Sequence, residues 1–163
     1  MGVKTRSFLK NTNRTFDNIL DSLGGPQNVK SVNAAANLST TDCGTIILGE
    51  VGTIQAAATG FNVNLPAPVR GAYFKFILAA PSIANNSNAA ITITTTSDGT
   101  SAANLGVGHV QVNNASTNVV SAVDIVTFVH NAATAGDYAE CISDGTNWFF
   151  NIVGDAAGSV TLA

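Results

Sequence analysis

Apolar and polar residues alternate with a period of two along most of the chain after residue 31. Alternation of this kind predicts β-strands with one buried face, because successive side chains of a strand point to opposite sides. The alternating runs are 61–65, 73–78, 91–94, 109–112, 125–130, 138–143, 148–152 and 160–162. No run between them has helical periodicity, so the crossover helices of a parallel α/β fold are missing.

The segments that join these runs are rich in turn-forming residues, such as 85–88, 97–99 and 135–137. Asp144-Gly145-Thr146-Asn147 joins two of the strongest runs and predicts a β-hairpin. Short strands at this spacing favour an all-β fold. We therefore predict an antiparallel β-sandwich or jelly-roll-like body over residues 32–163.

Residues 1–31 differ from the body and predict an extended arm that contains a short helix. Thr12 or Asn13 is suited to cap this helix, and Gly24-Gly25-Pro26 would end it. One face of the helix carries four apolar residues at helical spacing: Phe16, Ile19, Leu20 and Leu23. A helix of two to three turns is marginally stable alone, so we expect it to lie on a surface of its own body, a neighbouring copy or another protein.

Charge is unevenly distributed along the chain. The first thirty residues hold five basic residues and two carboxylates, a net charge of +3. The other residues hold two basic residues and eight carboxylates, a net charge of −6. The five basic residues of the first segment are Lys4, Arg6, Lys10, Arg14 and Lys30. A cationic arm on a sparsely charged, acidic body is typical of a protein that docks on a larger assembly.

Motifs of catalysis or metal binding are absent from the sequence. His109 and His130 lie in or at the end of alternating runs and lack the spacing of zinc ligands. Gly106-Val107-Gly108 resembles part of a dinucleotide loop, but we interpret its glycines as strand residues that permit close packing. We predict no enzymatic activity, no metal and no cofactor.

Three carboxylates, Asp137, Glu140 and Asp144, lie close in sequence. They lack the pattern of a calcium loop, and we expect Asp144 to cap the predicted hairpin turn. The two carboxylates of a glycosidase can lie far apart in a chain, so a small glycan hydrolase remains an alternative. We interpret Cys43 and Cys141 as small buried residues with reduced thiols.

The arm also bears on targeting and on nucleic acids. Residues 1–10 lack the apolar stretch of a signal peptide, and no run has the hydrophobicity of a membrane span. A net charge of +3 is small for binding duplex nucleic acid. We expect a protein made in a cytoplasm that binds neither membrane nor nucleic acid.

Two parts of the body resemble a known group of proteins. Segments 124–130 and 135–150, with Ser143-Asp144-Gly145-Thr146-Asn147-Trp148 as the most specific piece, are similar to the end of small β-rich structural proteins of tailed bacteriophages. Segment 60–68, which ends in Leu-Pro-Ala-Pro, and the aromatic segment 72–77 are similar to a run in the same proteins. Within that group the chain most resembles capsid decoration (cement) proteins.

This resemblance implies a structural virion protein on the capsid surface that binds the major capsid protein and self-associates, often as a homotrimer. The arm itself matches no shared motif, so its role follows from charge and pattern alone. We expect its basic residues to meet acidic capsid surface and its apolar residues to fill a groove. The predicted capsid-binding residues are Lys4, Arg6, Phe8, Lys10, Arg14, Phe16, Ile19, Leu20 and Leu23.

The alternative function is a phage fibre or spike module that binds host surface glycan. It would use an exposed aromatic residue, such as Tyr73 or Trp148, to stack on a sugar ring. We interpret Trp148 as a core or subunit-contact residue instead, because it opens a run of alternating apolar residues.

Overall fold

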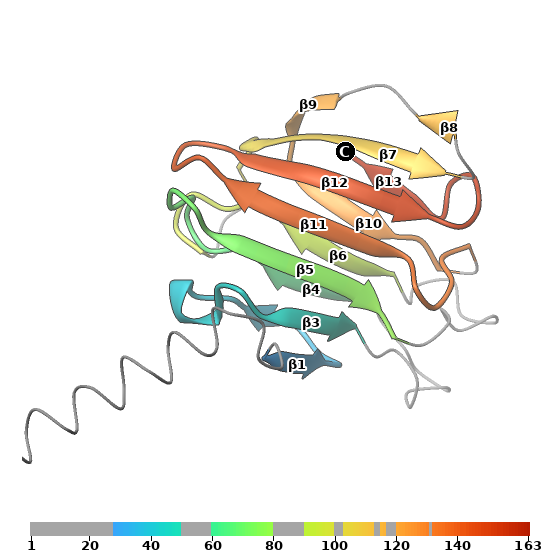
Figure 1. The fold of residues 1–163 in the computed structure, drawn as a ribbon, viewed down its shortest axis with the longest axis horizontal. Coiled ribbons are helices and arrows are strands. Elements are labelled where there is room, and N and C mark those ends of the chain that lie inside the picture. The colour runs from blue at the N-terminus through green and yellow to red at the C-terminus, as the bar shows by residue number, and fades with distance from the viewer. Residues whose placement is uncertain are drawn as a thin grey trace, which may run out of the picture.

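A computed structural model describes residues 28–49, 60–79, 90–99, 103–112, 115–116, 120–130 and 132–163. These residues form two β-sheets that pack face to face, which confirms the predicted all-β fold (Figure 1). The helical content of the described ranges is a single 3-10 turn, Thr40–Asp42.

The front sheet in Figure 1 has eight strands in the order β1-β3-β5-β11-β12-β7-β8, with β9 also paired to β7. Its strands are β1 (Val29–Val32), β3 (Ile46–Gly49), β5 (Tyr73–Leu78), β7 (Gly106–Val112), β8 (Ala115–Ser116), β9 (Val120–Val123), β11 (Tyr138–Ser143) and β12 (Trp148–Gly154). The rear sheet has five strands in the order β13-β10-β6-β4-β2. They are β2 (Ala36–Asn37), β4 (Phe61–Asn64), β6 (Ile91–Thr94), β10 (Ile125–Phe128) and β13 (Val160–Leu162).

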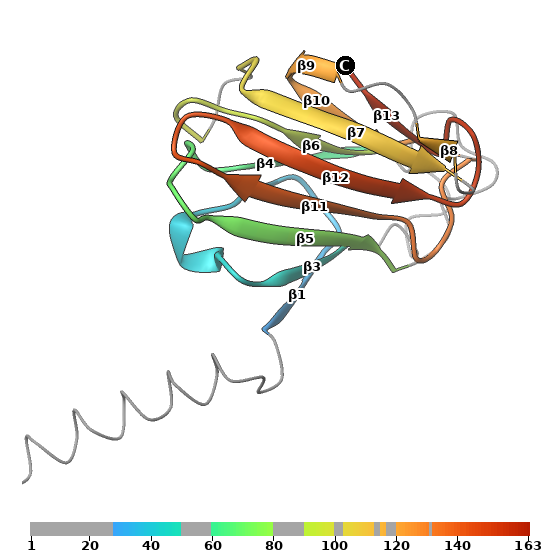
Figure 2. The ribbon, with the colours of Figure 1, turned by 45° about the horizontal axis from the view of Figure 1, so that its top comes forward.

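Both sheets are mixed, whereas the sequence predicted antiparallel pairing. From β1 to β6 the chain crosses to the other sheet after every strand, so β1, β3 and β5 are parallel neighbours, as are β2, β4 and β6 (Figure 2). A strand of the opposite sheet thereby supplies the long crossover that a parallel pair needs, in place of a helix. The pairs β5–β11–β12 and β6–β10–β13 are antiparallel as expected.

The first strand begins at Val29, three residues before the start that we predicted for the body. The rest of the predicted arm, with its helix and all nine predicted capsid-binding residues, lies outside the described residues.

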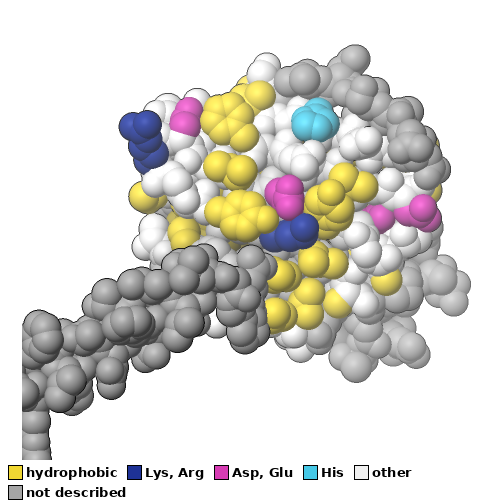
Figure 3. Space-filling view, in the orientation of Figure 1, with side chains coloured by type: hydrophobic (Ala, Val, Ile, Leu, Met, Phe, Trp, Pro, Cys, Tyr) yellow, Lys and Arg dark blue, Asp and Glu magenta, His cyan; other side chains and the backbone are white. Residues whose placement is uncertain are grey.

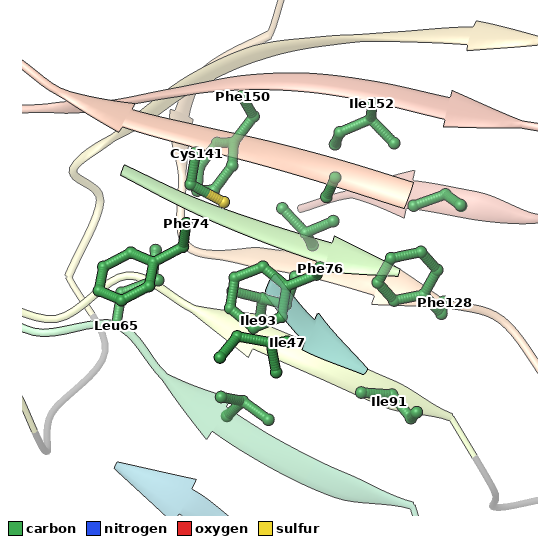
Figure 4. Packing of buried hydrophobic residues seen from close by; sticks show 14 of the residues in the cluster. Ile47, Leu65, Phe74, Phe76, Ile91, Ile93, Phe128, Cys141, Phe150 and Ile152 are labelled. Carbon is green, nitrogen blue, oxygen red and sulfur yellow. The ribbon is translucent and has the colours of Figure 1, made fainter. Parts of the chain in front are cut away.

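Large apolar side chains from both sheets fill the space between them (Figure 4). Trp148 is fully buried, and its ring centroid lies 5.8 Å from that of Phe74 in a tilted contact. This placement confirms that Trp148 is a core residue. Aromatic pairs at this separation add to the free energy gained by burial alone.

Two glycines of β7 let the large side chains of β12 lie against it. A Cβ atom on either Gly106 or Gly108 would lie 2.7 Å from an atom of Phe150, which is too close for a real contact. Gly108 is also the register partner of Phe150 in the parallel pair. The interpretation of these residues as strand glycines is therefore confirmed, and β7 has no helix after it of the dinucleotide-binding kind among the described residues.

The predicted hairpin joins β11 and β12. The Oδ1 atom of Asp144 accepts hydrogen bonds from the backbone N–H groups of Thr146, at 2.7 Å, and Asn147, at 2.8 Å. These bonds lower the pKa of Asp144, with the bond from Asn147 the larger cause. Gly145 adopts a φ of +101°, which favours glycine. Asp144 thus caps the turn, as predicted.

Candidate docking surface

Every second side chain of each strand points to the outer face of the eight-stranded sheet. On that face, side chains of neighbouring strands form rows that run across the strands. Strand register sets these rows, because directly paired residues point to the same side of a sheet. The row nearest the β11–β12 turn is Tyr73, Ile142, Phe149 and Val107, and we call it the apolar row. The middle row is Lys75, Glu140, Asn151 and His109. The far row is Ile77, Tyr138, Val153 and Gln111.

The apolar row holds two of the four exposed large apolar side chains of the described residues. Ile142 is 52% exposed and Phe149 is 43% exposed, and they are direct cross-strand partners. Tyr73 and Val107 flank them and are half-buried. Figure 3 shows apolar side chains gathered on this face over β5, β11 and β12. Adjacent exposed apolar side chains of this kind are candidate anchors for a binding partner.

A hollow of about 330 Å³ opens on the same face, between β11, β12 and β7. Its lining includes Val107 and Phe149 on one side and His109 and Asn151 on the other. The hollow is therefore mostly apolar and has a polar rim, which suits an inserted aromatic or aliphatic side chain.

An ion pair lies in the middle row. Lys75 Nζ is 3.1 Å from Glu140 Oε1, and it lies 4.6 Å from the centroid of the Tyr138 ring. Asn151 Nδ2 donates to Glu140 Oε2 at 3.2 Å, and the Tyr73 hydroxyl donates to Oε1 at 3.4 Å. These contacts fix the positions of the Lys75 ammonium group and the Glu140 carboxylate, and the two opposite charges compensate each other.

The pKa values of this pair shift as the geometry requires. The hydrogen bond from Lys75 lowers the pKa of Glu140, and the same bond raises the pKa of Lys75. Burial is the first cause that raises the pKa of Tyr73, followed by the charge of Glu140. Glu140 and Lys75 therefore stay ionised at neutral pH, and their charges cancel within the face.

The three carboxylates that lie close in sequence take separate structural roles. Glu140 belongs to the ion pair and Asp144 to the hairpin turn. Asp137 is buried and accepts hydrogen bonds from the backbone N–H groups of Thr134, at 3.0 Å, and Asp155, at 2.8 Å. Glu140 thus links two neighbouring strands, Asp144 stabilises a hairpin turn, and Asp137 binds the backbone of the segments before β11 and after β12. In the described ranges, no three histidine, cysteine, aspartate or glutamate residues gather into a group that could hold a metal ion.

The histidines and cysteines lie at separate places in the described part of the chain. His109 is half-buried in the middle row, and His130 is half-buried in the turn after β10. Both cysteines are free thiols. Cys141 is buried as predicted, and burial raises the pKa of its thiol. Cys43 is exposed, contrary to our interpretation, because it follows the 3-10 turn at one end of the sandwich.

The two aromatic residues considered for glycan stacking are not available as free platforms. Trp148 is fully buried, and Tyr73 is half-buried with its hydroxyl bonded to Glu140. Sequence reasoning overlooked the residues that the surface does expose, Ile142 and Phe149. A signal for them was present: strand 148–152 begins Trp-Phe-Phe, so it is apolar on both sides and predicts that both sides become covered.

The outer face of the five-stranded sheet has a different chemistry. Its register places Asn62, Thr92, Thr127 and Thr161 in one row. Asn62 Oδ1 accepts from the hydroxyls of Thr92, at 2.9 Å, and Thr94, at 2.6 Å. Asn62 Nδ2 donates to Asn64, which in turn donates to Asn37 at 2.8 Å. This row is polar and uncharged, and the asparagines and two of the threonines bond to one another, while Ile125 lies on the same face beside Thr94.

No family model, curated protein or solved structure matches this chain. Within the described ranges, no helix is long or apolar enough to span a membrane.

Proposed function

We propose that this chain is a structural virion protein: a capsid decoration (cement) protein that binds the outer surface of a tailed phage's major capsid shell and stabilises it. The observation that supports this most is the outer face of the eight-stranded sheet. It presents Ile142 and Phe149 to solvent beside a compensated ion pair, on a body with few charges. Such a face gains free energy when another protein covers it.

The stabilising effect follows from mass action. A protein that binds the closed shell, and not its separated subunits, lowers the free energy of the closed shell alone. Association as a homotrimer would multiply weak contacts through effective concentration. The arm would add a second contact, in which Lys4, Arg6, Lys10 and Arg14 meet acidic shell surface and steer the encounter.

Sedimentation of the purified protein with shells tests this function. The shells are those of the phage whose genome encodes the chain, prepared without it. We expect saturable binding at hundreds of copies per shell and greater resistance of the shell to heat. A full-length variant with Lys4, Arg6, Lys10 and Arg14 all replaced by glutamate should bind weakly while its body unfolds at the wild-type temperature. Absence of saturable wild-type binding would contradict the function, and unchanged binding of the variant would contradict the role of the arm.

A further inference from the structure

The chain enters the sandwich at the level of the apolar row, two strands away from its first member. Ile46 donates its backbone N–H to the carbonyl of Asn28 at 2.9 Å, which fixes Asn28 at the start of β1. In register, Val29 pairs with Ile46, and Ile46 pairs with Lys75. Asn28 therefore lies within one residue of the level of Tyr73, the first member of the apolar row. Residues 1–27 thus join the body on the edge strand of the sheet whose outer face is apolar.

The apolar row and the apolar stripe of the predicted arm helix match in length. Neighbouring strands lie about 4.8 Å apart, so Tyr73 on β5 and Phe149 on β12 are separated by two steps, about 10 Å. A helix rises about 1.5 Å per residue, so Leu23 and Phe16 are separated by about 10 Å along its axis. A helix laid across the strands would place Leu23 over Tyr73, Ile19 and Leu20 over Ile142, and Phe16 over Phe149.

The connecting residues can span the required gap. Leu23 would sit above β5, two strands from β1, which is about 10 Å across the sheet. A layer packed on a sheet lies about 10 Å above it, so the direct distance is about 14 Å. The five steps from Leu23 to Asn28 reach up to about 17 Å when extended. Gly24 and Gly25 allow the tight change of direction that this path needs.

We propose that, in the free protein, residues 12–23 form a helix that covers the apolar row of its own chain, with Phe16 at the hollow beside Phe149. This arrangement buries two exposed apolar side chains of the face, Ile142 and Phe149. It also brings residues 1–27, with a net charge of +2, onto a body whose net charge is −5. The inference does not rest on the capsid function. If both hold, the shell and the arm helix compete for the apolar row.

A disulfide tests the proposal by joining the N-terminal end of the predicted helix to the β7 end of the apolar row. Thr12 lies on the stripe side of the helix, one turn beyond Phe16, and Val107 ends the apolar row on β7. The full-length variant carries Thr12→Cys and Val107→Cys with Cys43→Ser, and it keeps all four stripe residues. Under mild oxidation we expect a cross-link within one chain, at a rate about tenfold or more above the matched control, because the tether raises the effective concentration.

The control replaces Val107→Cys by Thr161→Cys, an exposed position on the other outer face. Equal rates of cross-linking in the two variants would overturn the proposal. A cross-link between two chains would also overturn it, because the apolar row would then bind the arm of a neighbouring copy. A second readout leaves the body unaltered: Phe16→Ser with Leu20→Ser should move the methyl resonances of Ile142 and Val107 and leave that of Thr161 in place. Unmoved Ile142 and Val107 signals would overturn the proposal. Both tests use free protein, so their failure is separate from failure to bind shells.

Discussion

The two outer faces of the sandwich are both formed by mixed β-sheets, and their surface chemistry differs. On the five-stranded sheet, Asn62 and its neighbours form a network in which amides and hydroxyls bond to one another. On the eight-stranded sheet, Ile142 and Phe149 stand in solvent beside a compensated ion pair. A face that satisfies its own hydrogen bonds gains little from a partner, whereas a face with apolar area in water gains when it is covered.

The difference between the two faces also indicates which residues contribute to the free energy of binding and which contribute to the free energy of folding. Covering the exposed half of Ile142 and of Phe149 stabilises a complex by about 0.8–1.5 kcal/mol each. The ion pair of Lys75 and Glu140 contributes orientation and selectivity more than affinity, since its charges are already satisfied. We therefore expect substitutions on the apolar row to change binding and substitutions in the Asn62 network to change folding.

The largest expected effect comes from removing the exposed apolar area. Ile142→Ser with Phe149→Ser should weaken binding to the shell by about 30-fold or more, because two exposed anchors lose their buried area. The free energy of unfolding of the body should change less than the binding, because about half of each side chain lies outside the body's own packing. Sedimentation titration measures the binding, and urea denaturation measures the folding. The matched control is Thr127→Ser with Thr161→Ser on the other face, and equal weakening by the control would remove the distinction between the faces.

The polar network should show the reverse behaviour. Asn62→Ala should lower the free energy of unfolding by about 2 kcal/mol, because the buried hydroxyl of Thr94 loses its acceptor. Binding to the shell should stay within about twofold of wild type. Asn37→Ala, at the exposed end of the network, is the control and should cost about 0.5 kcal/mol. A loss of binding in Asn62→Ala at a temperature where it is fully folded would assign the polar face to the interface.

Much of this fold could be predicted from the sequence, and the limits have physical causes. The eight alternating runs correspond to β4, β5, β6, β7, β10, β11, β12 and β13. Strand β3 was not predicted, since its Ile46-Ile47-Leu48 is a short continuous apolar run without alternation. Parallel pairing was also missed. A period of two identifies a strand but does not identify its neighbour, so the crossings between sheets leave no trace in the pattern.

The candidate site was harder to predict than the fold. In β5, Tyr73 and Phe74 are both aromatic, and only Lys75 indicates which of them faces outward. Placing Ile142 beside Phe149, and Lys75 beside Glu140, requires the register of three strands. That register depends on the whole sheet and cannot be read from any one segment. The arm was found from its charge and stripe alone, and its role remains a prediction.

A smaller effect is expected from the ion pair and depends on pH. The pKa of Glu140 is lowered in the folded state, so the pair adds stability above the ordinary glutamate pKa, about 4.3. This contribution is lost as the pH falls through the lower folded pKa. Glu140→Gln should therefore be less stable than wild type by about 0.5–1 kcal/mol at pH 7, and this difference should shrink as the pH falls below the ordinary glutamate pKa. Asp42 and Asp144 also have lowered pKa values, but they titrate alike in both proteins and cancel in the difference. A difference that is constant from pH 7 to pH 3 would contradict this role of the pair.

The smallest expected effect tests whether apolar composition alone makes a face adhesive. Thr127→Val with Thr161→Val gives the polar face two adjacent apolar side chains without touching Asn62. Both are surface strand positions where valine is well tolerated, so the free energy of unfolding should change by less than about 0.5 kcal/mol. Shell binding, measured by the same titration, should stay within about twofold, because binding to a specific partner needs a complementary shape and a matched rim as well as apolar area. If this variant instead gains as much affinity as the apolar row contributes, the two faces differ only in composition, and the hollow, the ion pair and the order of the row have no part in recognition.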